Sequence, residues 1–261
     1  MSGDTATVII TGVERDTVLA RSIEALGRFP TTQPWVLIGG IAVFLRLGLI
    51  TRPTSDADTI ARSQADLIAA LIDTDVTSVV SGGDIEIEVD NNVVEIDVMD
   101  LADDPLPPGN ELRVFALARR CALTTAEAQH VMIADTNNTT IASSTIPVAT
   151  IAALTALKTV SMVRRPHSKH PHKVGSDIHD LVRLINNGTA RDIAETLANF
   201  NTELATWVES EINRAFGHDL KYTILRLRKH DRSAAAVALR DEDIEAALIL
   251  ADALHQLQID T

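Results

Sequence analysis

The stretch that decides the fold is WVLIGGIAVFLRLGLITRPTSDADTIA, residues 35–61. Its apolar start predicts a short buried strand over 35–38, a turn at Gly39 and Gly40, and a helix over 41–49. Residues 55–60 are predicted to be extended, so Asp56 and Asp58 point to the same side with their Cα atoms roughly 6 to 7 Å apart. Two carboxylates that close favour a bound cation, and Mg²⁺ prefers such oxygen ligands.

A hairpin downstream supplies a third carboxylate. Apolar and polar residues alternate over 84–99, with a turn at Asp-Asn-Asn, which predicts two strands with one apolar face. Glu95 and Asp97 fall on the opposite face by the same alternation. Asp97, central in its strand, is the better candidate to meet Asp56 and Asp58, while Glu95 fits the solvent-facing side of a hairpin. Three carboxylates can hold two Mg²⁺ ions.

Composition indicates an ordinary globular protein. Hydrophobic residues make up 46% of the 261 residues, and Cys121 is the single cysteine, which excludes an internal disulfide and a four-cysteine zinc site. The start of the sequence lacks the pattern of a signal peptide, and the longest apolar run is interrupted at Arg46. We therefore expect a cytoplasmic protein without a membrane partner.

Charge is segregated along the sequence. The net charge of −13 argues at first against nucleic acid. However, residues 84–104 are acidic without a lysine or arginine, whereas 158–173 and 221–232 are rich in both. This pattern suits a protein that gathers metal cations at one place and polyphosphates at another. The stretch 221–232 is equally compatible with a solvated face.

Two lobes are predicted. The segment LADDPLPPGN, 101–110, breaks helix and strand, IPVAT at 146–150 ends as a strand before a helix, and the chain from Asp177 onward is helical in pattern, including 193–211. The expected fold class is α+β, with a first lobe over 1–149 and an all-helical lobe over 150–261. Residues 112–140 carry no assignment.

Three strings together resemble a known family. They are G39-G40-x-A42 followed by R52-P53-T54-S55-D56-A57-D58, then K158-T159-V160-S161-M162-V163-R164-R165, and then D177-I178-H179-D180-L181. Their order and spacing resemble the DNA polymerase beta-like nucleotidyltransferase superfamily, and within it the AbiEii branch, which includes toxins of AbiE and MenT type toxin–antitoxin systems. The resemblance implies a mixed, largely antiparallel sheet flanked by helices in the first lobe.

The resemblance also implies a reaction, the Mg²⁺-dependent transfer of a nucleoside monophosphate from a nucleoside triphosphate with release of pyrophosphate. Asp56, Asp58 and Asp97 would hold two metal ions, and Lys158 would neutralise the triphosphate. Asp177 would orient that lysine or the substrate. The remaining nucleotide-binding candidates are Gly39, Gly40, Arg52, Thr54 and Asp180, the last of which mainly braces the lobe.

In MenT-like toxins the acceptor is the 3′ end of transfer RNA, which receives pyrimidine nucleotides. By resemblance we expect CTP or UTP as substrate, the tRNA acceptor stem as partner, a cognate antitoxin, and no DNA. Two alternatives stay open, namely a transferase that modifies a small molecule or protein, as an antibiotic-inactivating enzyme does, and a catalytically silent nucleotide-binding or partner-binding protein.

The sequence departs from the family pattern at Ser176, where a basic residue often precedes the first aspartate of D-x-x-D. Lys173, Arg164 or Arg165 can supply that charge. Ala57 is smaller than the usual apolar residue, which affects packing and not chemistry. A cluster of histidines follows no common zinc spacing and favours a flexible basic loop; its members are His167, His170, His172 and His179.

Overall fold

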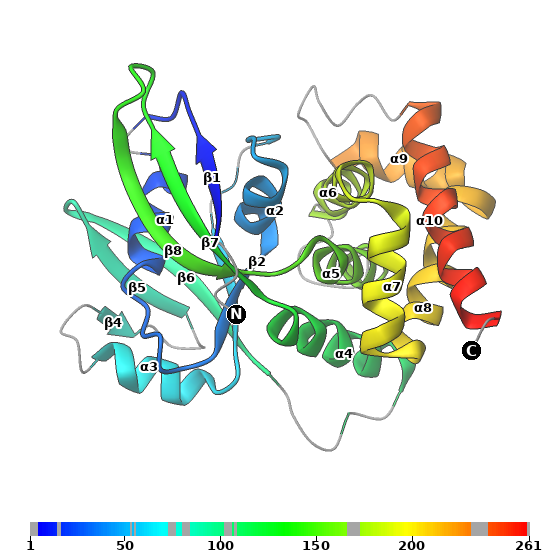
Figure 1. Cartoon of the computed structure of the whole chain (residues 1–261), viewed down its shortest axis with the longest axis horizontal. Coiled ribbons are helices and arrows are strands. Elements are labelled where there is room, and N and C mark those ends of the chain that lie inside the picture. Colours follow the sequence, from blue (N-terminus) through cyan, green and yellow to red (C-terminus); the bar gives the residue numbers. More distant parts are fainter. Residues whose placement is uncertain are drawn as a thin grey trace. The chain divides into compact units, whose positions relative to one another are not determined.

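The chain forms two compact units in the computed structural model (Figure 1). The structure describes residues 5–14, 17–52, 54, 56–72, 77–79, 84–101, 106, 109–165, 173–230 and 240–259. The first unit comprises 1–102 and 122–150, and the second 103–121 and 151–261. Both the predicted lobes and these units have a boundary near residue 150. They differ at 103–121, because the helix that follows the proline-rich segment packs with the helical unit.

A mixed eight-stranded sheet organises the described part of the first unit, in the order β1-β7-β8-β2-β3-β6-β5-β4. Three neighbouring pairs are parallel (β1–β7, β2–β8 and β3–β6) and the other four are antiparallel. The prediction of an α+β fold is therefore confirmed. The strands are β1 (Ala6–Ile10), β2 (Trp35–Ile38), β3 (Ala57–Ala61), β4 (Thr77–Val79), β5 (Asp84–Val89), β6 (Asn92–Asp100), β7 (Glu127–Ala134) and β8 (Thr140–Val148).

Three helices belong to this unit, namely α1 (Val18–Leu26), α2 (Gly39–Leu47) and α3 (Gln64–Ile72). Helix α1 packs on β5, β6 and β8, and α2 on β2 and β3. The predicted turn at both glycines is wrong, because α2 begins at Gly39 itself. A φ of +71° at Gly39 changes the chain direction within one residue, which glycine permits at no steric cost. Gly48, with φ +69°, ends the helix in the left-handed conformation.

The predicted hairpin is confirmed as β5–β6. Asp90 and Asn91 form its turn with φ values of +51° and +59°, the sign that a two-residue hairpin turn requires at both positions. The side chains on the apolar face of both strands, including Ile85, Ile87 and Ile96, are buried, whereas Val93 next to the turn is exposed. The apolar face therefore packs into the core as the alternation predicted.

The unassigned segment 112–140 contains α4 (Asn110–Thr124), all of β7 and the first residue of β8. The strand predicted at 146–150 is the end of the longer β8. Its earlier half is rich in Ser and Thr, which obscures the hydrophobic alternation. The N-cap assigned to Thr150 agrees with the start of the next helix at Ile151.

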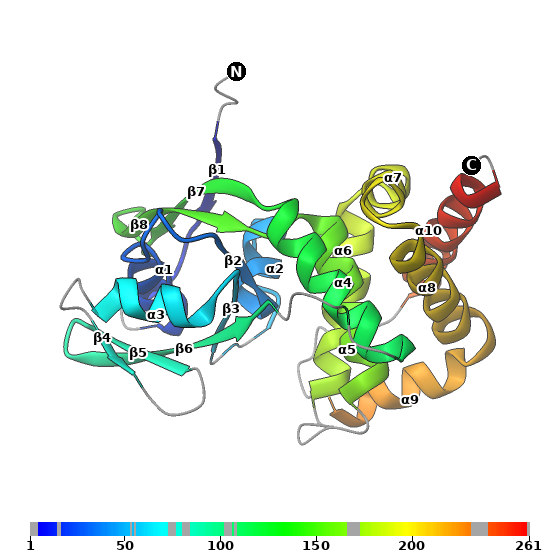
Figure 2. The same cartoon turned by 90° about the horizontal axis from the view of Figure 1, so that it is seen from below.

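Helices build the second unit, and Figure 2 shows them from below. They are α4, α5 (Ile151–Arg164), α6 (Val174–Asn187), α7 (Ala190–Phe200), α8 (Thr202–Ile212), the π-helical segment η3 (Asn213–His218), α9 (Leu220–His230) and α10 (Asp241–Ile259). The single helix predicted over 193–211 is wrong. Asn201 is extended (φ −166°, ψ 120°) and its side chain accepts from the Leu204 amide, so it caps α8. Across the described ranges, no helix combines the length and apolar character needed to span a bilayer.

Candidate active site

The junction of β2 and α2 at Gly39 leaves room for the side chain of Asp58. A Cβ atom at Gly39 would lie 1.9 Å from Asp58 Oδ2 and 2.7 Å from its Cγ, distances that no side chain can occupy. Asp58 is the register partner of Ile38, the last residue of β2. Glycine at position 39 therefore serves both the left-handed backbone and the close approach of the carboxylate.

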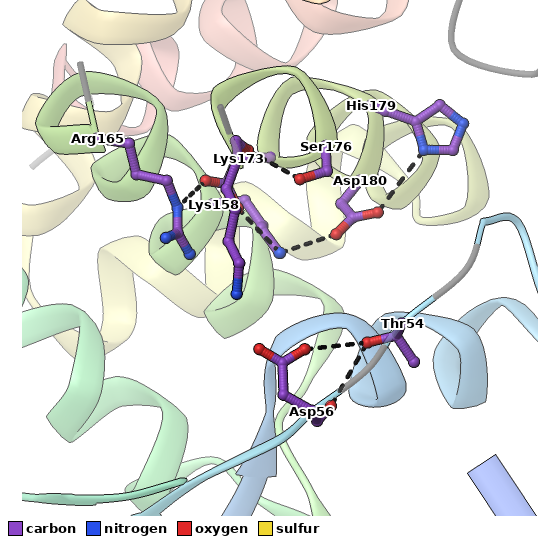
Figure 3. A network of polar contacts seen from close by, with 9 residues as sticks. Thr54, Asp56, Lys158, Arg165, Lys173, Ser176, His179 and Asp180 are labelled. Carbon is purple, nitrogen blue, oxygen red and sulfur yellow. Dashed lines mark hydrogen bonds and ion pairs between the residues drawn. The ribbon is translucent and has the colours of Figure 1, made fainter. Parts of the chain in front are cut away.

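Gly40 brings two more predicted residues to the same place. A Cβ atom there would lie 2.9 Å from Arg52 Nη2 and 3.1 Å from Thr54 Oγ1. Thr54 Oγ1 in turn lies 3.4 Å from both the backbone oxygen and Oδ1 of Asp56 (Figure 3). Pro53 and Ser55 of the same motif lie outside the described residues. The start of α2 thus has a guanidinium, a hydroxyl and two carboxylates around it.

Asp97 joins Asp58 through the sheet register. The two residues pair directly in the parallel ladder of β3 and β6, and register partners on neighbouring strands face the same side about 4.8 Å apart. Thr59 Oγ1 also donates to the Asp97 carbonyl oxygen at 3.1 Å. Asp56 precedes β3 by one residue, in irregular backbone, so strand alternation places Asp58 but does not reach Asp56.

Asp84 extends this row, because it pairs with Asp97 across the hairpin. It was not among the predicted site residues. Counting back from the two-residue turn at Asp90 and Asn91 gives this pairing. The turn predicted at Asp-Asn-Asn leaves the register open by one residue. Glu95, by contrast, is exposed and pairs with Glu86.

The chemistry of these donors fits Mg²⁺. Carboxylate oxygens from separate strands are the ligands that this ion takes, together with waters and substrate phosphates. Within the ranges the structure describes, no three or more His, Cys, Asp or Glu side chains are gathered tightly enough to enclose a metal ion. The assignment of the metals to Asp56, Asp58 and Asp97 stays a prediction.

Arg46 anchors the far end of α2. Its guanidinium donates to the carbonyl oxygens of Val148 and Ala149, each at 2.7 Å, and to Glu127 Oε2 at 2.7 Å. Burial lowers the pKa of Arg46, and the hydrogen bond and charge of Glu127 oppose that shift. These contacts fix α2 against the end of β8, and hence hold in place the helix whose first residues surround Asp58.

A second cluster lies in the helical unit, around Lys158 on α5. Lys158 Nζ contacts Asp177 Oδ1 at 3.1 Å and Asp180 Oδ2 at 2.8 Å, and Figure 3 shows the latter contact. Lys158 is 6% exposed, Asp177 2% and Asp180 0%. The two aspartates lie one turn apart on α6, so one ammonium meets both. The predicted association of Lys158 with the D-x-x-D segment is present within this unit.

Arg165 supplies the positive charge that Ser176 lacks. Its Nε donates to Asp177 Oδ2, whereas Ser176 Oγ donates to the Lys173 carbonyl oxygen at 2.8 Å. Arg164 instead lies 4.4 Å from the centroid of the Phe115 ring. Arg165 is therefore a basic side chain that contacts the D-x-x-D segment directly.

His179 is buried beside Asp180, with Nδ1 3.7 Å from Asp180 Oδ1. Of the four histidines it is the one that the described residues include, and it lies in α6 (Val174–Asn187). The assignment of His179 to a flexible loop is therefore wrong. His167, His170 and His172 lie outside the described residues, as does Lys169, so the choice between a basic loop and a metal site stays a prediction.

Comparison with known proteins places this chain in a family. Residues 21–256 match the family described as nucleotidyl transferase AbiEii toxin, type IV TA system. No curated protein shows significant similarity to the sequence.

Two solved structures resemble the chain. The crystal structure of an antigenic nucleotidyltransferase-like protein from Paracoccidioides brasiliensis is 20% identical, with a TM-score of 0.46, over 85% of this chain and 94% of that chain. The solution structure of the antibiotic-resistance factor ANT(2'')-Ia is 16% identical, with a TM-score of 0.37, over 78% and 96%. Because the family match covers most of the sequence, the chain belongs to the AbiEii nucleotidyl transferase toxins of type IV toxin–antitoxin systems and is a nucleotidyltransferase.

Proposed function

We propose that this nucleotidyltransferase transfers a nucleoside monophosphate from CTP or UTP to the 3′ end of transfer RNA, with Mg²⁺, as the toxin of a toxin–antitoxin system. The observation that carries the catalytic part is the direct pairing of Asp58 with Asp97. The carboxylate of Asp58 lies where a side chain at position 39 would be, so this arrangement requires glycine there. A merely structural row of aspartates would not require Gly39 to leave room for a carboxylate.

The residues have separate tasks in this proposal. Asp58 and Asp97, with Asp56 beside them, would hold Mg²⁺, which supplies positive charge to the triphosphate and makes an acceptor hydroxyl more acidic. Arg52 and Thr54, close to Gly40, offer a guanidinium and a hydroxyl to phosphate oxygens. The free amides at the start of α2 favour negative charge in the same place.

In this proposal Lys158 neutralises the triphosphate, and two aspartates position its ammonium group. Its ammonium has three donors, and Asp177 and Asp180 engage it in the structure. In the proposal, those carboxylates keep the side chain extended and charged within the helical unit, with Arg165 compensating Asp177.

The RNA acceptor is supported by the family to which the chain belongs and by the basic stretches at 158–173 and 221–232. A cognate antitoxin as partner follows from the same family. The overall charge of −13 favours a second candidate, a small-molecule acceptor, because a polyanion is repelled by most of an acidic surface.

One experiment separates the candidates. The protein is incubated with each α-labelled nucleoside triphosphate, Mg²⁺ and total RNA, and the products are resolved by size. Label in the tRNA band that disappears with Asp58→Ala supports the proposal. Pyrophosphate release without labelled RNA supports a small acceptor. A catalytically silent protein would arrest growth even as the Asp58→Ala variant, and the wild type would transfer no nucleotide to any acceptor.

A further inference from the structure

Helix α9, whose place in the helical unit can be followed in Figures 1 and 2, carries a basic face in a protein with a net charge of −13. Successive residues of a helix are about 100° apart. Within an arc of about 160° on α9 lie five residues whose side chains the structure describes. They are Lys221, Tyr222, Leu225, Arg226 and Arg228. Thr223 and Leu227 lie on the other side and are buried. Thr223 Oγ1 donates to the Ala215 carbonyl oxygen at 2.7 Å, which secures the orientation of the helix.

The cations on this face have no carboxylate partners within the described chain. Arg226 contacts Tyr222 alone, by stacking at 4.1 Å from the ring centroid and by a hydrogen bond of 3.2 Å to the hydroxyl. Lys221 and Arg228 are exposed and make no ion pair among the described residues. Elsewhere in the helical unit the exposed arginines are paired, as Arg191 is with Glu195 at 2.6 Å.

Tyr222 adds a ring to this face. It is the single tyrosine of the chain, its side chain is 53% exposed, and Leu225 beside it is 60% exposed. A tyrosine buries its ring when packing alone determines its place. An exposed ring bordered by three cations instead has the features of a stacking platform on a charged track, which is how proteins hold unpaired nucleotides.

We infer that this face of α9, hereafter the α9 face, is a binding surface for RNA, with Lys221, Arg226 and Arg228 on backbone phosphates and Tyr222 stacked on a base. Charge complementarity favours a polyanion. The exposed large apolar side chains of this face are Tyr222 and Leu225, which is less than the apolar stripe by which an amphipathic helix enters a lipid surface. The inference rests on the proposed RNA acceptor and adds where the helical unit holds it.

The test measures binding of unfractionated tRNA over a salt series for wild type, Lys221→Glu, Arg228→Glu and Tyr222→Leu. Removing one cation from a phosphate lowers the slope of log K against log salt by about 0.7 to 0.9. Loss of base stacking weakens binding about tenfold. Tyr222→Phe, which keeps the ring, is expected to bind as wild type does. Arg191→Glu is the matched charge control and should leave the salt slope unchanged.

A second measurement needs no substitution at the surface. Incorporation of 3-fluorotyrosine labels Tyr222 alone, so the ¹⁹F spectrum has one resonance. This resonance should shift on addition of tRNA and stay in place on addition of phosphatidylglycerol vesicles. Circular dichroism and thermal unfolding confirm that each variant is folded.

The outcomes are distinct. Suppose that the wild type binds and labels tRNA, that both charge variants keep the wild-type salt slope, and that the ¹⁹F signal does not move. This result would overturn the inference and leave the proposed function standing. No tRNA binding by wild type would overturn both. A fluorine shift with vesicles but not with tRNA would assign the face to a membrane surface and overturn the inference.

Discussion

Replacement of Gly39 by alanine tests the geometry at the start of α2. Two costs arise in the folded state. A φ of +71° destabilises the folded state by about 1 to 2 kcal/mol when the residue has a Cβ. Alanine also lowers the conformational entropy of the unfolded chain, which offsets about 0.4 to 1 kcal/mol of that loss. The added carbon also falls 1.9 Å from Asp58 Oδ2, and displacing that side chain costs about 1 to 3 kcal/mol. We expect a net loss of about 1 to 5 kcal/mol.

Gly48 provides the matched control at the other end of the same helix. Its φ is +69°, and nothing lies within 4 Å of a Cβ built there. Gly48→Ala therefore bears the backbone cost alone, about 1 kcal/mol or less, and leaves Asp58 undisturbed. The difference between the two variants isolates the contact with the carboxylate.

Urea unfolding measures the stability of each variant, and Mg²⁺-dependent pyrophosphate release measures its transfer activity. Gly39→Ala should lose transfer activity about as completely as Asp58→Ala, because the carboxylate can no longer occupy its place, whereas Gly48→Ala should keep it. Equal stability losses for the two alanine variants, or a Gly39→Ala enzyme as active as wild type, would refute the reasoning.

Other substitutions address the remaining parts of the molecule. Lys158→Met leaves two buried carboxylates with less compensation, so urea unfolding should show a loss of about 3 to 5 kcal/mol; a loss below about 1 kcal/mol would mean that the cluster is effectively solvated. Arg46→Met removes the donors to two carbonyl oxygens at the end of β8, and we expect a loss of about 2 to 3 kcal/mol, with Arg46→Lys recovering part of it. Mg²⁺ should raise the melting temperature of wild type in calorimetry, and Asp97→Asn should abolish that rise. Asp84→Asn serves as the control from the same row, and an equal effect of both substitutions would contradict the choice of Asp97 as ligand.

Local patterns carried much of the prediction. Alternation over 84–99 gave both strands of the β5–β6 hairpin and the buried faces of its side chains, because side-chain parity depends only on neighbours along the chain. The candidate residues of the first unit were identified from a motif, in which two glycines are followed by a basic residue and two aspartates at a characteristic spacing.

Other features had no local signal. Hydrophobic periodicity ran without a break through Asn201, where a capping side chain divides α7 from α8. Strands β7 and β8 lie between β1 and β2 in the sheet, although they follow both by a long stretch of chain. In β8, the Ser-rich and Thr-rich first half weakened the alternation that a half-buried strand otherwise shows.

The sequence by itself determined which side chains are candidates for the chemistry and which face of a strand they occupy, because those properties depend on residue type and on the two-residue repeat of extended chain. Only the tertiary structure decided which of them meet. The parallel pairing of β3 with β6 brings Asp58 to Asp97, and the packing of α5 on α6 turns Arg165, and not a residue at position 176, to Asp177. Both depend on contacts between segments distant in sequence, whose free energy no local pattern records.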